Sequence, residues 1–234
     1  MGQRGDTVLG PLKVAATGIV RTNFAGPHLF GAAMFARQAF GLEQTGIASD
    51  RPSSFFDETR SFVVAAILLS VACAEAWAGE VAADPDVFFP LKDLATTRAA
   101  LDEMIRWSSV ARKYNRLAEL ANVAPPDFAA GPDAAMKDLI LLRNNLIHFH
   151  AEWPDARDVH EKVERCLVGR FRRSPLLHPG GAFFPDAFAS YDAARWSVTT
   201  ARGFVERVAE RAGWPHPWAK PIHADKLVLP DARS

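Results

Sequence analysis

The sequence has 234 residues, enough to bury a sizeable core, and with 49% hydrophobic and 23% charged residues it is globular rather than disordered in composition. Lysine plus arginine and aspartate plus glutamate number 27 each. The net charge of zero argues against a general polyanion binder, so any contact with nucleic acid has to come from a local patch. Two cysteines, Cys73 and Cys166, make neither a disulfide framework nor a four-cysteine metal site, which indicates a reducing compartment.

The N-terminal segment carries no recognisable targeting signal. Its first 15 residues lack a basic stretch followed by an apolar one, so secretion is not expected. Asp6 stands where a myristoylation motif requires Ser or Thr, which argues against a lipid anchor. We therefore expect a cytoplasmic protein.

One segment, Phe62–Gly79, is apolar enough to raise the question of a membrane span. Its 18 residues are borderline for crossing a bilayer, and it contains Ser70 and Glu75. A carboxylate within a span costs a few kcal/mol. A buried core helix is therefore favoured over a membrane helix, and no membrane contact is expected.

Apolar residues recur at helical spacing, and no sustained period-two alternation is present. The first 27 residues are predicted to form an extended arm or short strands, followed by a short helix, His28–Phe40, that Gly41 ends. A loop then leads to a long helix from about Phe56 to Ala83, which stops at the Asp84-Pro85 turn. The remaining predicted helices are Leu91–Asn122, a helix from after Gly131 to His150 or Ala151, Trp153–Arg173 with Asp155 as its cap, and Ala189–Gly213.

These elements predict an all-α fold, a helical bundle built on two long antiparallel helices plus shorter helices. The predicted organisation is an N-terminal arm and short helix (1–55), a helical domain (56–213) and a C-terminal tail (214–234). Trp214 and Trp218 lie among prolines in the tail, where they are expected to pack onto the core rather than stack on bases.

Arg143 is the unusual residue of the predicted helix that follows Gly131. It projects from near the middle of a broad apolar arc, whose members are Met136, Leu139, Ile140, Leu142, Leu146, Ile147 and Phe149. A buried guanidinium costs several kcal/mol unless a partner satisfies it. Either Arg143 forms an internal ion pair, with Glu75 as the obvious partner, or this arc faces a second subunit or a cleft that binds an anion.

The stretch "RNNLIH", Arg143 to His148, resembles the R-x-x-x-x-H signature of the HEPN superfamily of small helical nucleotide- and RNA-binding domains. The residue after the arginine is commonly polar in that pattern, and Asn144 fits it. The helical frame agrees, because the motif follows an earlier long helix with an acidic residue, Glu75, near its end. The resemblance covers roughly residues 56–213.

This resemblance implies a metal-independent endoribonuclease that needs no cofactor and works as a homodimer, with the motifs of both protomers meeting in one cleft. It also implies RNA or a nucleotide as ligand, a possible role as a toxin or defence effector, and a possible antitoxin-like partner protein. His148 can move the proton of the ribose 2′-hydroxyl or return one to the leaving oxygen. Arg143 can hold the scissile phosphate. Asn144 can orient His148 or contact the phosphate.

Two alternatives stay open at this point. His150 offers a second spacing, R-x-x-x-x-x-x-H, that the family also tolerates. On an ideal helix His150 aligns with Arg143 and His148 aligns with Asn144, and we favour His148. The other alternative is a non-catalytic HEPN-like module that uses the same residues to bind a nucleotide, RNA or a partner protein.

A basic cluster follows the motif and is a candidate track for the RNA backbone. Solvation and compensation of a helix dipole are the favoured explanation of such a cluster. Its members are Lys162, Arg165, Arg170, Arg172 and Arg173. No metal site is expected, because His148 and His150, two positions apart on a helix, point in different directions.

Overall fold

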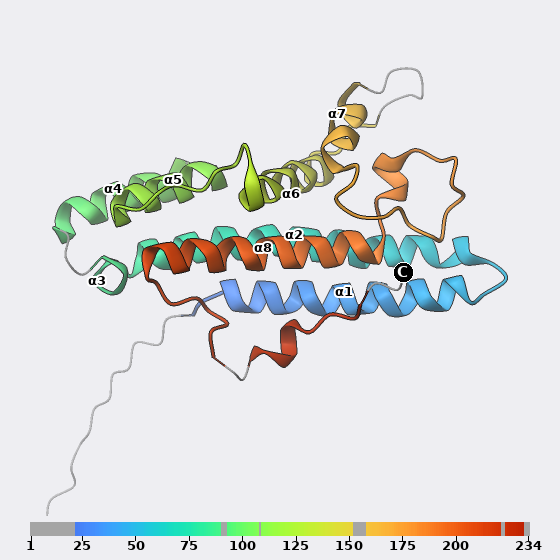
Figure 1. Cartoon of the computed structure of the whole chain (residues 1–234), viewed down its shortest axis with the longest axis horizontal. Coiled ribbons are helices and arrows are strands. Elements are labelled where there is room, and N and C mark those ends of the chain that lie inside the picture. Colours follow the sequence, from blue (N-terminus) through green and yellow to red (C-terminus); the bar gives the residue numbers. More distant parts are fainter. Residues whose placement is uncertain (1–21, 90–92, 108, 152–157, 221–222, 232–234) are drawn as a thin grey trace, which may run out of the picture.

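The computed structural model describes residues 22–89, 93–107, 109–151, 158–220 and 223–231. All regular secondary structure in these ranges is helical, so the all-α prediction is confirmed for the described part of the chain. Three long helices pack against one another as a bundle: α1 (Ala25–Ile47), α2 (Phe56–Ala83) and α8 (Tyr191–Ala212) (Figure 1). α1 is antiparallel to both α2 and α8, which run in the same direction (Figure 1).

Small side chains allow α1 and α2 to pack closely. The fully buried positions of α1 include Ala32, Ala36 and Ala39, and those of α2 include Ala66 and Ala74. Alanine loses almost no side-chain entropy on burial and lets two helix backbones approach each other. The result is a long contact between the two helices, with α8 packed against both.

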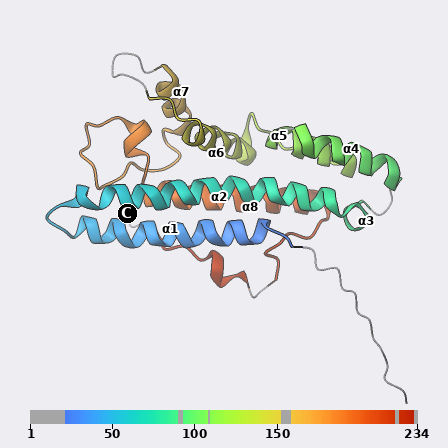
Figure 2. The same ribbon diagram turned by 180° about the vertical axis from the view of Figure 1, so that it is seen from behind.

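A layer of further helices covers the other side of α2 and α8 (Figures 1 and 2). It contains α4 (Leu94–Trp107), α5 (Val110–Ala121) and α6 (Gly131–Ile147), and the short α3 (Pro85–Phe88) leads into it. Tyr114 of α5 joins this layer to the bundle: its hydroxyl donates to the carbonyl of Ala74 at 2.8 Å, and its ring meets Phe204 edge-on at 4.6 Å. Because Tyr114 is completely buried, this hydrogen bond satisfies a hydroxyl that water cannot reach.

The first helix is longer than the sequence predicts, and it belongs to the bundle rather than to an arm. It continues through Gly41, whose missing side chain faces open space, so this glycine costs only its helix propensity of about 1 kcal/mol. The start of the helix is fixed from α2, because Glu80 accepts hydrogen bonds from the N–H groups of Phe24 (2.7 Å) and Ala25 (2.8 Å). The helix continues to Ile47, so the expected end at Phe40 was wrong.

Other predicted boundaries also need correction. The single helix expected over Leu91–Asn122 is two helices, and the side chain of Ser109 caps the second by accepting the N–H of Arg112. The helix expected over Trp153–Arg173 is described from Asp158 to Leu167 as α7, while its expected cap, Asp155, lies outside the described residues. A single π-helical turn, Phe183–Ala187, occupies the predicted loop before α8.

The tail packs on the bundle as predicted. Trp214 and Trp218 are both buried. Their indole N–H groups donate to the Phe88 carbonyl at 2.8 Å and to the Glu206 carboxylate at 2.7 Å. These bonds satisfy the polar atom of each ring, so both rings serve as anchors for the tail.

Residues Pro52–Ala83 include a helix that is long and apolar enough to cross a membrane by length and composition, with a mean hydropathy of 2.0 in its most apolar window. Half of that window is buried inside the protein. Val63, Ile67 and Val71 of α2 are completely buried in the hydrophobic core. A core helix meets the same criteria of length and composition, and this burial is the pattern that such a helix has.

Candidate functional site

α6 carries the "RNNLIH" motif, and its apolar residues fix its orientation on the bundle. Met136, Leu139 and Leu142 are completely buried, and α6 packs against both α2 and α8. The start of α6 is tied to α8 by Asp133, whose carboxylate accepts from Arg207 at 3.0 Å and from Arg211 at 3.2 Å. These contacts at one end, and the buried leucines along the helix, determine which side chains its other end presents.

Arg143 forms an ion pair with Glu75 of α2 in the same chain. The pair is not deeply buried, because 18% of the Arg143 side chain and 39% of the Glu75 side chain are exposed. One terminal nitrogen of the guanidinium, Nη2, donates to Glu75. The other guanidinium nitrogens have no hydrogen-bond partner among the described residues and are not sealed from solvent. Glu75 therefore holds the guanidinium in place while part of its donor fork stays available.

His148 is the C-cap that follows the last residue of α6, Ile147, whereas the helix was expected to continue to His150 or Ala151. Its backbone has left the helix (φ −106°, ψ 50°), and its N–H donates to the Asn144 carbonyl at 2.9 Å. The helical angles that aligned His150 with Arg143 therefore do not apply. Asn144, His148 and His150 are all exposed, and the expected side-chain bond between Asn144 and His148 is not formed among the described residues.

Two large apolar side chains expected on the buried arc are exposed beside the motif. Ile147 is 51% exposed and Phe149 is 47% exposed. Phe149 stacks on His160 of α7, with ring centroids 5.5 Å apart, and His160 in turn contacts Phe184. Because the helix ends at Ile147, the backbone turns here and the side chains of Ile147 and Phe149 stay partly outside the core.

An open groove of about 540 Å³ lies beside the end of the motif. Leu146 and Phe149 line it from the motif side, and Arg60 and Ser61 line it from α2. Arg60 is paired with Asp57 at 2.9 Å. A second carboxylate, Asp186, also lines the groove and lies 3.7 Å from Arg60, so the groove combines an aromatic wall with an arginine that has two acidic neighbours.

Some side chains of the predicted basic cluster already have partners within the described part of the chain. Arg170 donates to Asp138 at 3.0 Å through Nε, Arg172 pairs with Asp192 at 2.5 Å, and Arg173 donates to the carbonyl of Gly181. Lys162 and Arg165 of α7 are exposed and form no ion pair with a described residue. These last two remain the members with uncommitted charge for a nucleic-acid backbone.

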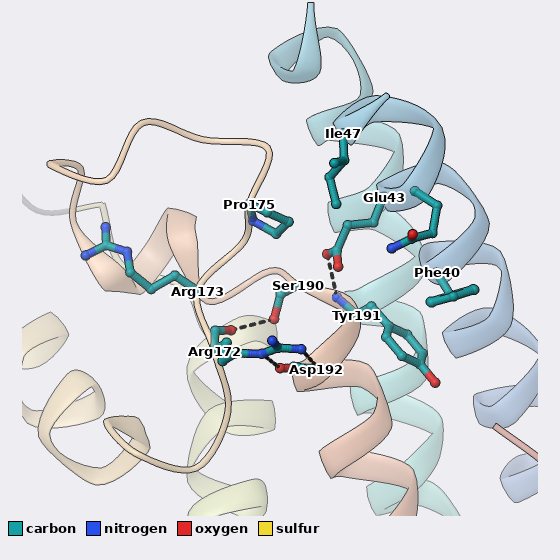
Figure 3. Close-up of a pocket in the computed structure, with 10 residues that line it drawn as sticks. Phe40, Glu43, Ile47, Arg172, Arg173, Pro175, Ser190, Tyr191 and Asp192 are labelled. Carbon is teal, nitrogen blue, oxygen red and sulfur yellow. Dashed lines mark hydrogen bonds and ion pairs between the residues drawn. The ribbon is translucent and has the colours of Figure 1, made fainter. Parts of the chain in front are cut away.

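A second polar feature lies far along the chain from the motif, in a cavity of about 420 Å³ between the end of α1 and the start of α8 (Figure 3). Its Glu43 carboxylate is buried and accepts the N–H of Tyr191 at 2.9 Å. Burial raises the pKa of Glu43 to about 6, and the neighbouring Asp192 acts in the same direction, while the Tyr191 hydrogen bond and Arg172 oppose it. Sequence reasoning missed this site because the first helix was expected to end before Glu43.

The remaining candidate chemistry is limited in the described ranges. No group of three or more His, Cys, Asp or Glu residues there is placed to hold a metal ion. Cys73 is completely buried, which raises its thiol pKa far above the ordinary range and makes it a poor nucleophile, whereas Cys166 is partly exposed.

Comparison of the chain with protein-family models, with curated proteins and with solved structures found no significant match.

Proposed function

We propose that this protein is a HEPN-type, metal-independent endoribonuclease that acts as a homodimer in the cytoplasm, with Arg143, Asn144 and His148 in its site. The observation that carries the proposal is the geometry of Arg143. Its guanidinium is held by Glu75 at the edge of the core, retains unpaired donors, and lies on the same helix end as two exposed polar side chains. An arginine that can hold a phosphate and an accessible imidazole that can transfer protons are groups with which metal-independent phosphodiester cleavage proceeds.

In this mechanism the chain supplies acid–base and electrostatic catalysis. His148 removes the proton of the ribose 2′-hydroxyl or protonates the leaving 5′-oxygen, with the His148 of the second protomer available for the complementary step. The 2′-oxygen forms a bond to phosphorus as the bond to the 5′-oxygen breaks, which leaves a 2′,3′-cyclic phosphate. The free donors of Arg143 bind the phosphate oxygens as negative charge develops on them.

The dimer is supported by the apolar surface around the motif. Ile147 and Phe149 flank His148 and are each about half exposed. Apolar side chains of this size next to a polar site are typical of surfaces that a partner covers. A second copy of the chain would bury Ile147 and bring two motifs together, while the groove lined by Phe149 and Arg60 would be available to a base of the RNA.

The experiment compares RNA cleavage by the purified protein and its variants, with and without a chelator. We expect cleavage that resists the chelator and leaves 2′,3′-cyclic phosphate ends. Arg143→Ala and His148→Ala should each reduce the rate at least 100-fold, because each removes a group used only in the transition state. His150→Ala serves as the matched control and should stay within a few-fold of the wild type.

Circular dichroism of each variant establishes that the fold is intact. Cleavage that survives both Arg143→Ala and His148→Ala rules out this site. Loss of cleavage in His150→Ala with retention in His148→Ala transfers the acid–base role to His150.

The second candidate function is a non-catalytic helical module of the same type, which binds a nucleotide, RNA or a partner protein such as an antitoxin. The ion pair between Arg143 and Glu75 within one subunit favours it, since a paired guanidinium also has a purely structural role. RNA binding without cleavage, weakened by Arg143→Ala, would support this function instead.

A further inference from the structure

Glu43 forms one wall of the cavity between α1 and α8, and only half of its carboxylate is used by the fold. Its residue is 8% exposed, and Oε2 accepts the N–H of Tyr191. Oε1 has no partner among the described residues. Figure 3 shows the carboxylate between the ring of Pro175 and the start of α8, where it borders the cavity. The hydrogen bond between the two helices therefore uses Oε2, and Oε1 remains available to a donor from a ligand.

The basic side chains around the cavity have other hydrogen-bond partners. Arg172 is paired with Asp192, and Arg173 donates to the Gly181 carbonyl and points away from the other lining residues (Figure 3). Arg172 acts on Glu43 through space, but Glu43 forms no ion pair with a described residue, so its carboxylate remains open to a cationic donor. A buried carboxylate of this kind is stabilised by a cationic donor and destabilised by an anion.

Beside these polar residues, part of the lining is apolar and aromatic. Phe40 and Tyr191 meet edge-on with ring centroids 4.9 Å apart, and Ile47 and Pro175 complete the lining on the opposite side. Aromatic rings attract a nearby cation, and the aliphatic side chains accommodate a hydrocarbon stem. A volume of about 420 Å³ is within the range of small-molecule sites.

We propose that this cavity binds a small organic cation, whose primary ammonium donates to Oε1 of Glu43 and whose apolar stem lies among Phe40, Ile47 and Pro175. The carboxylate determines the charge of the ligand, and the rings determine its amphipathic character. The site shares no residue with the motif on α6, so this proposal does not depend on the proposed ribonuclease function.

The test is an NMR titration of the full-length protein at pH 7.5 with phenethylammonium chloride, its neutral isostere 2-phenylethanol, and inorganic phosphate. We expect the ammonium to bind at least tenfold more tightly than the alcohol, and phosphate not to bind at this cavity. Glu43→Gln should weaken the ammonium at least tenfold, because the amide retains an acceptor for the Tyr191 N–H but loses the charge. Glu58→Gln, an exposed position on α2, is the matched control and should bind like the wild type.

A lysine side chain carries the same head group, so Nα-acetyl-lysine N-methylamide is titrated in parallel. Tighter binding of this probe would assign the ligand to a partner protein, and tighter binding of the free amine would assign it to a metabolite. The proposal is overturned by equal affinity of the wild type and Glu43→Gln for the ammonium, by equal affinity for the ammonium and the alcohol, or by the absence of ammonium binding.

Discussion

Glu43 both links two helices and places a carboxyl group of raised pKa at a cavity. Its carboxylate joins α1 to the first N–H of α8, yet it is ionised at neutral pH in a place where burial raises its pKa to about 6. The folded protein therefore favours the neutral form of the Glu43 carboxyl more strongly than water does, yet at neutral pH this group is ionised. Such groups are expected where a ligand or a pH response is useful, since an optimised structural tie would need no charge.

This residue gives a prediction for stability against pH. The folded state binds the Glu43 proton more tightly than the unfolded state, whose pKa is near 4.5. The contribution of the protonated Glu43 to the stability of the folded state is therefore complete below pH 4.5, and it is lost as the pH rises through about 6. Between pH 4 and pH 7.5 the unfolding free energy of Glu43→Gln should rise relative to the wild type by about 2 kcal/mol, as measured by urea denaturation at a series of pH values. Parallel pH profiles for the two proteins would show that the environment of Glu43 does not shift its titration.

At the scale of elements, α6 is held to the bundle by two carboxylates at its opposite ends. Asp133 in its first turn is bound by Arg207 and Arg211 of α8, and Arg143 near its other end is bound by Glu75 of α2. The carboxylate of Asp133 is only 6% exposed and lies at the positive end of the helix dipole, so its charge is compensated from several directions. These three ion pairs fix the helix along its axis, which apolar packing alone does less well.

Removing the charge of Asp133 should therefore be costly. Asp133→Asn leaves Arg207 and Arg211 partly buried without a carboxylate, and we expect it to lower the unfolding free energy by about 3 kcal/mol. Glu119→Gln is the matched control, because it breaks an exposed pair with Arg116 and should cost less than about 1 kcal/mol. Chemical denaturation measures both values. Equal losses in the two variants would contradict a special role for the buried carboxylate.

The sequence predicts most of the helices themselves, but it predicts their ends and their contacts with one another less accurately. The long apolar helix from Phe56 to Ala83 and the closing glycine of α8, Gly213, are found where the residue pattern predicts them. Gly41 was misread as a terminator because local preference for ending a helix is weaker than the burial of the residues that follow it. Glu75 could be proposed as a partner of Arg143, since both are charges in apolar helices. The contact between Glu43 and Tyr191, 148 residues apart, leaves no such trace in the sequence.

At the scale of the whole molecule, the apolar surface near the motif bears on the oligomeric state. The core is closed around α1, α2 and α8, yet Ile147 and Phe149 remain outside it at the end of α6. α2 meets the length and composition of a membrane span, but half of its most apolar window is already buried within the chain. The apolar side chains at the end of α6 are the ones that the proposed homodimer would bury.

Ile147→Lys tests the proposed homodimer. Sedimentation equilibrium of the wild type should give a mass twice the 25.6 kDa of the chain, and Ile147→Lys should shift the protein towards the monomer, because the new charge would be desolvated in the interface. An exposed position tolerates the change within about 0.5 kcal/mol of stability, so loss of folding is not expected. The monomeric variant should also lose RNA cleavage although Arg143 and His148 are intact, whereas Arg143→Ala should remain dimeric and inactive. A monomeric wild type that still cleaves RNA would place both halves of the chemistry within one chain, and the site would then have to be completed by residues of the same subunit.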